Sequence, residues 1–408
     1  MGKTRAAARQ EKRRVRVGFT DMTFTLVVLL LLAMGIVMMF SASYAIAQNE
    51  DKPGYFYALR QVIFGGIGLV MMTIMSFVDY HIWMKKGFAI AVYLAAVVLL
   101  ILVMFIGTDL DTGCKRWINL GFTTFQPSEL AKFAIVILFS YLIDRNYDKM
   151  KQFIPGTLIY FILIGAVVGL LMLEPHLSCS LLIIMIGVVL VFVGGAKFWH
   201  LGIMVIIAAL LLTAVVFYLI NTRGVGYFTT RFETWLHPFD SEDTDGTWQT
   251  RQSLIAIGSG GIFGLGLGES RQKYLYLPES ENDFVFAIVC EELGLMGAIT
   301  VILLFVLLVA QGFHIAAHSK DRFGMLVAVG FTLQIALQAF INIAVVSGMV
   351  PNTGISLPFF SYGGTALIMQ LMQMGIVLNI SRTRQIVEDA PKKTQYESAP
   401  VPDFRHGA

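Results

Sequence analysis

The stretch Glu269–Gly297, ESRQKYLYLPESENDFVFAIVCEELGLMG, joins a long polar interval of the chain to a long apolar run. It places Glu279 and Asp283 four residues apart, just after Pro278. Proline is favoured at the first position of a helix, so the pattern predicts a helix that starts there and carries both carboxylates on one face. Carboxylates at the mouth of a membrane helix are costly unless something uses them, which makes this stretch the candidate site.

The same two acids have a plainer interpretation. Carboxylates at a helix N-terminus complement the helix dipole, which contributes about 0.3–1 kcal/mol and requires no chemistry. The aromatic and glycine residues just before them, together with Lys132 on the same expected membrane side, favour the functional interpretation. Glu281 and Asn282, between the two acids, are expected to be solvated neighbours.

The composition indicates an integral membrane protein. The chain has 408 residues, of which 56% are hydrophobic and 14% are charged, whereas soluble domains carry about 25% charged residues. The net charge is only +3, and the basic residues form no arm interleaved with aromatics, so no nucleic acid is expected as a partner. Cys114, Cys179 and Cys290 have neither disulfide nor zinc spacing and are expected to be buried small residues.

Apolar runs of nearly bilayer length recur along the chain. They lie near 23–40, 62–78, 88–106, 125–143, 153–173, 177–193, 198–220, 284–313, 325–346 and 359–380. Each is close to the ~20 residues that a bilayer needs, so they predict an all-α polytopic membrane protein with about ten transmembrane helices. The run Thr23–Phe40 exceeds the ~7–15 apolar residues of a secretory signal and is expected to be an uncleaved first helix.

The distribution of basic residues predicts that both termini are cytoplasmic. The expected inner loops hold Lys85, Lys86, Arg145, Lys149, Lys151, Lys197, Lys320 and Arg322, whereas the short outer loops hold Lys52, Lys115 and Arg116. This bias agrees with the positive-inside rule. One large extracellular loop is expected at about 221–283. Within it, Ser253–Gly268 is apolar but short and glycine-rich, which favours a helix lying in the outer membrane face or a re-entrant turn.

These boundaries predict three parts. Residues 1–17 form a basic cytoplasmic N-terminus, and residues 18–384 form the membrane domain. Residues 385–408 are polar and proline-containing, and we expect a disordered cytoplasmic tail.

Several polar residues within or beside the apolar runs need an explanation. Glu129 and Lys132 are three residues apart and can pair on one helix face, either as a structural ion pair or as a site that holds a cation for an anionic substrate. Arg116 and Trp117 lie just upstream, and a phosphate-bearing lipid head group would suit Lys132 and Arg116.

Other polar residues favour structural roles. The stripe Gln334, Gln338 and Asn342 is more often interhelical hydrogen bonding than a transport path. Glu291 and Glu292 are expected to pair with a neighbouring helix or with the last segment. His176, after Glu174 and Pro175, is expected to be solvated. The turn Ser361–Gly364 is either a packing turn or a polar patch that lines a cavity.

Taken together, these motifs resemble the SEDS family (shape, elongation, division and sporulation) over nearly the whole chain between the two tails. The matching motifs are Arg116–Gly121, Gln126–Lys132, Gln252–Gly261, Tyr276–Glu279 with Asp283-Phe284, and Leu357-Pro358 with Ser361–Gly364. The residues from Gly266 to Glu279 resemble the division and sporulation branches more than the elongation branch.

The resemblance implies a ten-helix peptidoglycan glycosyltransferase that polymerises lipid II at the extracellular face of the bacterial plasma membrane. It further implies work with a class B penicillin-binding protein among other divisome membrane proteins. The essential aspartate of the family corresponds to Asp283, which we expect to be catalytic. The expected substrate-binding residues are Gln126, Ser128, Glu129, Lys132, Arg116, Trp117, Gln252, Glu279 and Ser361.

Three positions depart from the family pattern. His176 stands where many members have Asp, which weakens any role for it. The run Ser280–Asn282 replaces the more usual small residue, His and Thr, so those side chains are not expected to be universal chemistry. Trp248 replaces a common Tyr and keeps an aromatic ring.

The implied reaction needs one general base, for which we expect Asp283. Lys132 and Arg116 are expected to neutralise the departing pyrophosphate. No metal-ligand pattern demands a cofactor, although a divalent cation held by the acids could share that duty. Two other functions stay open: a lipid II flippase that uses the stripe Gln334, Gln338 and Asn342 with Glu291 and Glu292, and a non-catalytic divisome scaffold.

Overall fold

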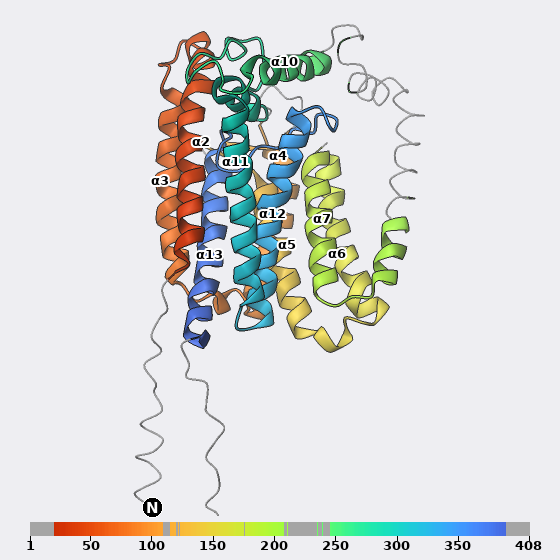
Figure 1. Ribbon diagram of the computed structural model, residues 1–408. Helices are drawn as coiled ribbons and strands as arrows, with labels where there is room; N and C mark the ends of the chain where they lie inside the picture. Colours follow the sequence, from red (N-terminus) through yellow and green to blue (C-terminus); the bar gives the residue numbers. More distant parts are fainter. Residues whose placement is uncertain are drawn as a thin grey trace, which may run out of the picture.

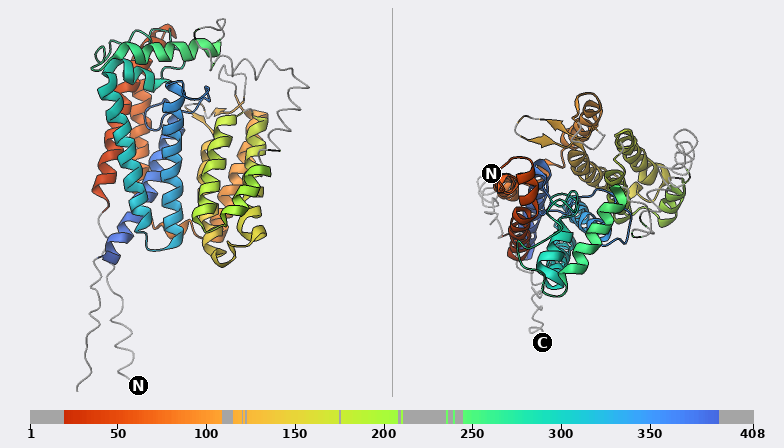
Figure 2. Two further views of the ribbon diagram at one scale, coloured as in Figure 1. Left: turned by 45° about the vertical axis from the view of Figure 1, so that its right-hand side comes forward. Right: turned by 90° about the horizontal axis from the view of Figure 1, so that it is seen from above.

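A computed structural model describes residues 20–108, 115–119, 121, 123–174, 176–207, 210, 235, 239 and 245–388. In this part of the chain long helices run side by side in one bundle, and α10 (Asp245–Gly260) lies across one end of it (Figures 1 and 2). The bundle contains α2 (Met22–Asn49), α3 (Phe56–Phe77), α4 (Lys86–Ile106), α5 (Pro127–Arg145), α6 (Ile159–Leu173), α7 (Leu177–Val193), α11 (Val285–Ala317), α12 (Arg322–Val346) and α13 (Gly364–Glu388). The predicted all-α fold class is confirmed.

Short elements connect the helices. The antiparallel strands β1 (Ile118–Asn119) and β2 (Thr124–Phe125) form a small hairpin before α5. Single turns lie at η1 (Tyr80–Ile82), η2 (Tyr147–Lys149) and η3 (Ile154–Leu158), the last being a π-helical turn that leads into α6.

Burial separates the inner helices from the outer ones. Seven helices of the described chain are long and apolar enough to cross a membrane. Most described residues of α5, α12 and α13 are buried, whereas α4 buries only Ala89, Tyr93, Ala96, Leu100 and Val103, so α5, α12 and α13 form the centre. The outer helices expose large apolar side chains such as Leu94, Val98 and Phe105 on α4. Such surfaces are stable only in lipid, so the chain is a multi-pass membrane protein.

The two ends of the described chain lie at the same end of the bundle, opposite α10 (Figure 1). The start of α2, the turns η1 and η2, and the end of α13 all lie there. This is the end that carries the basic loops on which the predicted orientation depends. The terminal segments, 1–19 and 389–408, lie outside the described residues.

Helix α11 is broken at Gly294, whose φ of 64° and ψ of −164° are not helical. The break allows the glycine-rich segment after α10 to contact the α11 backbone directly. A Cβ added to Gly264 would lie 2.1 Å from the carbonyl oxygen of Glu292, and one added to Gly294 would lie 2.3 Å from the amide nitrogen of Gly264. Only glycine permits an approach this close.

Backbone hydrogen bonds cross the gap between the two segments. They run from Leu265 N to Glu291 O (2.9 Å), Gly266 N to Glu292 O (3.0 Å), Leu295 N to Gly261 O (2.9 Å) and Met296 N to Ile262 O (3.2 Å). A broken helix at membrane depth is tolerated when neighbouring backbone satisfies the freed groups, as happens here.

Most predicted helix ranges are confirmed, and the differences lie at helix ends and at the break. The run 177–193 coincides with α7. The run 359–380 becomes helical only from Gly364, and α13 continues past the predicted domain end at residue 384. The predicted helix over 284–313 corresponds to α11, which has a break at Gly294 that the prediction does not include. The run 198–220 is helical over Phe198–Ile207, and most residues from 208 to 244 lie outside the described ranges.

The glycine-rich segment Ser253–Gly268 begins as a helix and ends in turns, and its position relative to the outer membrane face stays a prediction. Its first half belongs to α10, which lies across the bundle instead of entering it (Figure 2). Its second half forms the turns that contact the break in α11.

Candidate active site

Asp283 lies just before α11, in a turn. The predicted helix start at Pro278 is wrong, because the helix begins at Val285 and Glu279 has a left-handed φ of 57°. The amide of Phe284 donates to the carbonyl of Glu279 at 3.1 Å and closes the turn. The two acids therefore do not stack on one helical face: Glu279 is exposed, and Asp283 is partly buried.

The backbone of Asp283 is held by α12. The side-chain nitrogen Nδ2 of Asn342 donates to the carbonyl oxygen of Asp283 and to that of Ile355, each at 2.7 Å. Asn342 is 1% exposed. One buried amide therefore joins α12, the turn that carries Asp283 and the segment before α13.

The segment before α13 holds the preceding residues in the same way. The hydroxyl of Ser361 donates to the carbonyl of Asn282 at 2.6 Å and accepts from the amide of Leu357 at 2.7 Å. The amide of Tyr362 donates to the carbonyl of Glu281 at 2.9 Å. These partners engage carbonyls that a helix starting at Pro278 would use internally, so tertiary contacts override the local helix signal.

The charge environment of Asp283 makes it a stronger base than an ordinary carboxylate. Burial raises the pKa of the Asp283 carboxyl to about 7, the Glu279 carboxylate adds to the rise, and the Arg116 guanidinium opposes it. A group with a pKa near the working pH is suited to general base catalysis.

Glu281 is a further ionisable group of the site. Burial, followed by the charges of Glu279, Glu50 and Asp283, raises the pKa of the Glu281 carboxyl to about 7. Its Oε2 atom is buried and has no hydrogen-bond partner among the described residues. The expectation that Glu281 is a solvated neighbour is therefore wrong.

Arg116, beside the β1–β2 hairpin, links Asp283 to the corner between α6 and α7. Its Nε donates to the carbonyl of Glu174 at 3.3 Å. Burial raises the pKa of the Glu174 carboxyl to about 7, and Arg116 opposes this rise. Burial lowers the pKa of His176 to about 3, and the charges of Arg116 and Lys132 add to the effect. The expectation of a solvated His176 is wrong, because the ring is partly buried and its Nδ1 has no hydrogen-bond partner within the described chain.

The predicted pair on α5 is present. Lys132 Nζ lies 2.7 Å from Glu129 Oε1, and the two residues are 2% and 4% exposed. Gln126 is the N-cap residue of α5, with Pro127 in the first turn. Ser128 is buried, and its side chain interacts with the thiol of Cys179 on α7. The pairing is confirmed, and a role toward substrate stays a prediction.

The other predicted substrate-binding residues are less closely grouped. Trp117 is partly buried, and its carbonyl accepts the amide of Thr108 at 2.8 Å. Gln252 is buried on α10, which is separated in sequence from the turn of Asp283 by the glycine-rich segment. Ser361 uses its hydroxyl within the protein, so it supports Asp283 instead of facing an open space.

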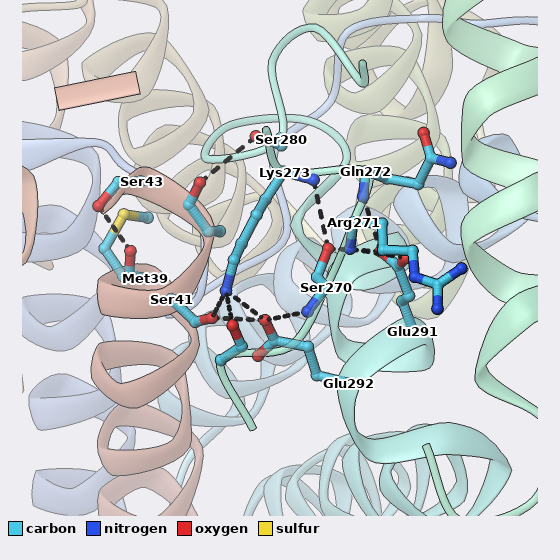
Figure 3. A network of polar contacts seen from close by, with 12 residues as sticks. Met39, Ser41, Ser43, Ser270, Arg271, Gln272, Lys273, Ser280, Glu291 and Glu292 are labelled. Atoms are coloured by element: carbon cyan, nitrogen blue, oxygen red, sulfur yellow. Dashed lines mark hydrogen bonds and ion pairs between the residues drawn. The ribbon is translucent and has the colours of Figure 1, made fainter. Parts of the chain in front are cut away.

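The two adjacent acids of α11 have the expected structural pairing. Glu292 contacts Lys273 at 2.9 Å and Ser41 of α2 at 2.5 Å (Figure 3). Glu291 accepts hydrogen bonds from the turn at 270–272 (Figure 3). The partners are thus α2 and the segment before Asp283; the last helix supplies none of these bonds.

A groove of about 650 Å³ opens between α2, α3 and residues 267–274. Its lining is mostly apolar and includes Ser41, Gly268 and Lys273. Asp283 is not part of the lining, so the groove is separate from the proposed base.

Comparison with known proteins fits this architecture. A family model described as "Cell cycle protein", which covers FtsW, RodA and SpoVE, matches residues 21–386. The chain belongs to this family.

Two named proteins of the FtsW/RodA/SpoVE family are similar to this chain over most of its length. The probable peptidoglycan glycosyltransferase FtsW of Geobacter sp. (strain M18) is 36% identical over 367 residues, which are 90% of this chain and 98% of that protein. Stage V sporulation protein E of Bacillus subtilis (strain 168) is 36% identical over 362 residues, covering 89% of this chain and 97% of the relative.

Solved structures of the family share the fold. A chain from a peptidoglycan synthase complex, studied for the structural coordination of polymerization and crosslinking, has a TM-score of 0.72 at 27% identity and covers 90% of this chain and 98% of its own length. The rod shape determining protein RodA of Thermus thermophilus has a TM-score of 0.63 at 27% identity, with coverage of 90% and 97%. The resemblance to the division and sporulation branches is confirmed by the FtsW and SpoVE relatives.

Proposed function

We propose that this chain is a peptidoglycan glycosyltransferase that polymerises lipid II during cell division. The names of its FtsW relatives support this activity. The observation that carries the proposal is Asp283, a carboxyl with a pKa near 7 that is held by its backbone between α12 and the segment before α13. The sequence pattern and the family resemblance both point to this residue, and the geometry supplies a physical reason for it.

Asp283 acts as the general base in a single inverting displacement. The 4-hydroxyl oxygen of the acceptor sugar attacks the anomeric carbon of the donor sugar, and the bond from that carbon to the polyprenyl pyrophosphate breaks. The hydroxyl proton passes to the Asp283 carboxylate. An α-linked pyrophosphate thereby becomes a β-1,4 link. No strong acid is needed, since pyrophosphate leaves as a stable anion.

Arg116 and Lys132 stabilise the pyrophosphate as its charge develops. Arg116 lies close enough to Asp283 to lower its pKa, so the cation and the base serve one region. The charges of Lys132 and Arg116 both lower the pKa of His176, which supports the view that the two cations lie on the same side of the site. Fixed cations in a dry site stabilise developing negative charge strongly, because they need no reorganisation during the reaction.

The remaining predicted residues hold the substrate around this centre. We assign Gln126, Ser128, Glu129, Trp117, Gln252 and Glu279 to binding and Ser361 to support of Asp283.

The described side chains offer no site for a resident metal ion. No group of three or more His, Cys, Asp or Glu residues within the described chain is arranged to hold one. A divalent cation would then arrive with the pyrophosphate. Calorimetry with Mg²⁺ on the protein alone tests this proposal: saturable micromolar binding without lipid II would contradict it.

The site faces the outside of the plasma membrane in this proposal. The start of α11, which Asp283 directly precedes, and α10 lie at the end of the bundle opposite the basic loops (Figure 1). The positive-inside rule assigns those loops to the cytoplasm. The family likeness to a peptidoglycan synthase complex supports a class B penicillin-binding protein as partner, with other divisome membrane proteins around it.

Polymerisation of purified lipid II in detergent is the decisive experiment, because transport has no meaning there. The wild type should give glycan strands on a gel with its penicillin-binding partner present. Asp283→Asn should give none while it binds the partner normally. Near-normal polymer from that variant would show that Asp283 is not the base.

The structure gives the flippase alternative little support. Its stripe is buried inside the bundle, with Gln334, Gln338 and Asn342 at 0%, 2% and 1% exposure. Glu291 and Glu292, which would continue the path, are engaged by the turn at 270–273. The scaffold alternative predicts no polymer from any preparation, so the same assay tests it.

A further inference from the structure

Five residues from α2, α11 and the turn before Asp283 form one buried polar cluster, which we call the clamp (Figure 3). The clamp consists of Ser41, Ser270, Lys273, Glu291 and Glu292. All five are buried, with exposures between 0% and 5%. The mechanism uses none of them.

Glu292 receives its hydrogen bonds at one oxygen. Its Oε1 accepts from Ser41 Oγ at 2.5 Å, from Lys273 Nζ at 2.9 Å and from the Ser270 amide at 3.3 Å. Lys273 Nζ also lies 3.0 Å from Ser41 Oγ and donates to the Gly268 carbonyl. Lys273 thus provides the charge that opposes Glu292 inside the bundle.

Glu291 binds the adjoining turn. Its Oε1 accepts from the Arg271 amide at 3.0 Å, and its Oε2 accepts from the Gln272 amide at 3.3 Å and from the Ser270 hydroxyl. Backbone amides that converge on one carboxylate fix the turn in a single conformation.

The clamp lies at one end of a short helical segment, and Asp283 lies at the other. The segment runs from Val285 to Leu293 and ends at the break at Gly294. At 1.5 Å per residue, Glu292 lies about 10 Å from Val285 along the axis, and Asp283 lies in the turn beyond Val285, so the clamp does not touch the base. Because the break interrupts the helical hydrogen bonds, the segment takes its direction from the clamp and from the backbone bonds to residues 261–266.

We propose that the clamp is a positioning device for Asp283. Lys273, Glu292 and Glu291 hold the segment Val285–Leu293 against α2 and so set the place of the carboxylate relative to the acceptor hydroxyl. The proposal rests on the proposed function in that it takes Asp283 as the base. Displacements of about 1 Å at a reacting group can cost about 100-fold in rate, so a remote support of this kind matters for turnover.

The charges of the clamp make the proposal testable by a mutant cycle. Removing one partner of a buried ion pair leaves an uncompensated charge, whereas removing both is often tolerated. The test uses the full chain with its penicillin-binding partner and four variants: Lys273→Met, Glu292→Gln, the double variant and Ser41→Ala. Lys86→Met, at an exposed position at the opposite end of the bundle, is the matched control.

Two readouts separate positioning from simple destabilisation. For lipid II polymerisation, Lys273→Met should lower kcat about tenfold or more with KM within about twofold, since the base moves while the binding residues at the start of α5 keep their places. The double variant should recover most of kcat, and Lys86→Met should match the wild type. Ser41→Ala, which removes only a hydroxyl, should fall between the wild type and Lys273→Met.

Hydrogen exchange provides the readout that does not depend on activity. In Lys273→Met, amides in residues 276–293 should exchange about tenfold faster, while those of α12 keep their wild-type rates. Unchanged kcat together with unchanged exchange in Lys273→Met and Ser41→Ala would overturn the proposal. So would a loss of kcat that the double variant fails to relieve. Absence of polymer from the wild type would refute the proposed function, and the exchange experiment would still decide about the clamp.

Discussion

The side-chain amide of Asn342 lies 2.7 Å from the backbone carbonyl oxygen of Asp283. The same nitrogen holds the carbonyl of Ile355, so one residue of the central helix α12 sets the distance between two loops. These two hydrogen bonds explain why the largely apolar helix α12 carries Asn342, and no transport path is needed to account for it.

Asn342→Leu should impair catalysis and stability together. It leaves two buried carbonyls without their donor, at a cost of about 1–3 kcal/mol each. We expect at least a tenfold loss of kcat for polymerisation and a lower melting temperature. Gln334→Leu is the matched control, because both polar atoms of that buried amide have no hydrogen-bond partner among the described residues. It should keep wild-type activity; equal losses in both variants would contradict the role of Asn342.

The pH dependence of the reaction should show the raised pKa of Asp283. The base must be ionised, so kcat/KM should rise with pH through about 7. Glu279→Gln removes the neighbouring negative charge, lowers the pKa of Asp283 and should move this limb to lower pH. An unchanged limb in that variant would show that another group controls it.

Stability should respond to pH in the direction opposite to that of a paired carboxylate. The pKa of Asp283 rises from 3.8 to about 7 on folding, so the native state binds the proton more tightly than the unfolded state. The stability that this tighter proton binding gives to the folded state is present at low pH. It is lost as the pH rises from 3.8 to about 7. Asp283→Asn should therefore gain stability relative to the wild type above about pH 7. Thermal unfolding in detergent at acid and alkaline pH measures the difference, and a constant difference would contradict it.

Gly294→Ala should be strongly destabilising. The residue has a left-handed φ of 64°, and an added Cβ would lie 2.3 Å from the Gly264 amide nitrogen. Gly169→Ala on α6 is the control, since nothing lies within 4 Å of an added Cβ there. The control should be neutral or stabilise by up to about 1 kcal/mol, because alanine has the higher helix propensity. Similar melting temperatures for the two variants would show that the break does not need glycine.

The pair of Lys132 and Glu129 can be tested for function apart from stability. Lys132→Met alone should destabilise the fold by about 3–5 kcal/mol, because Glu129 stays buried without its partner. The double variant with Glu129→Gln should recover the fold and still polymerise at least about tenfold more slowly, since the pyrophosphate has lost a cation. Full activity in the double variant would make the pair purely structural.

The helices could be predicted well from the sequence because the bilayer imposes a simple rule on them. Apolar runs of sufficient length correspond to nearly every described helix, and to α7 even at the level of single residues. The buried pair of Glu129 and Lys132 was also predictable, since its spacing is local to one helix turn.

The predictions that failed all depend on contacts between distant segments. Ser361 and Tyr362 bind the carbonyls before Asp283, so the helix signal at Pro278 is overruled. The structural pairing of Glu292 was expected, but its partners Lys273 and Ser41 come from distant segments that no periodicity indicates. Gly294 and Gly297 within the apolar run were the available signal for the break in α11.

The break at Gly294 has a practical consequence for protein engineering. The part of α11 before Gly294 forms backbone hydrogen bonds with the turns after α10, so it belongs to one unit with the segment that lies across the end of the bundle, although it is part of a membrane helix. Chimeras with other family members should therefore have their junction on the C-terminal side of Gly294. A junction at the apparent membrane boundary near Val285 would separate two halves of one hydrogen-bonded unit.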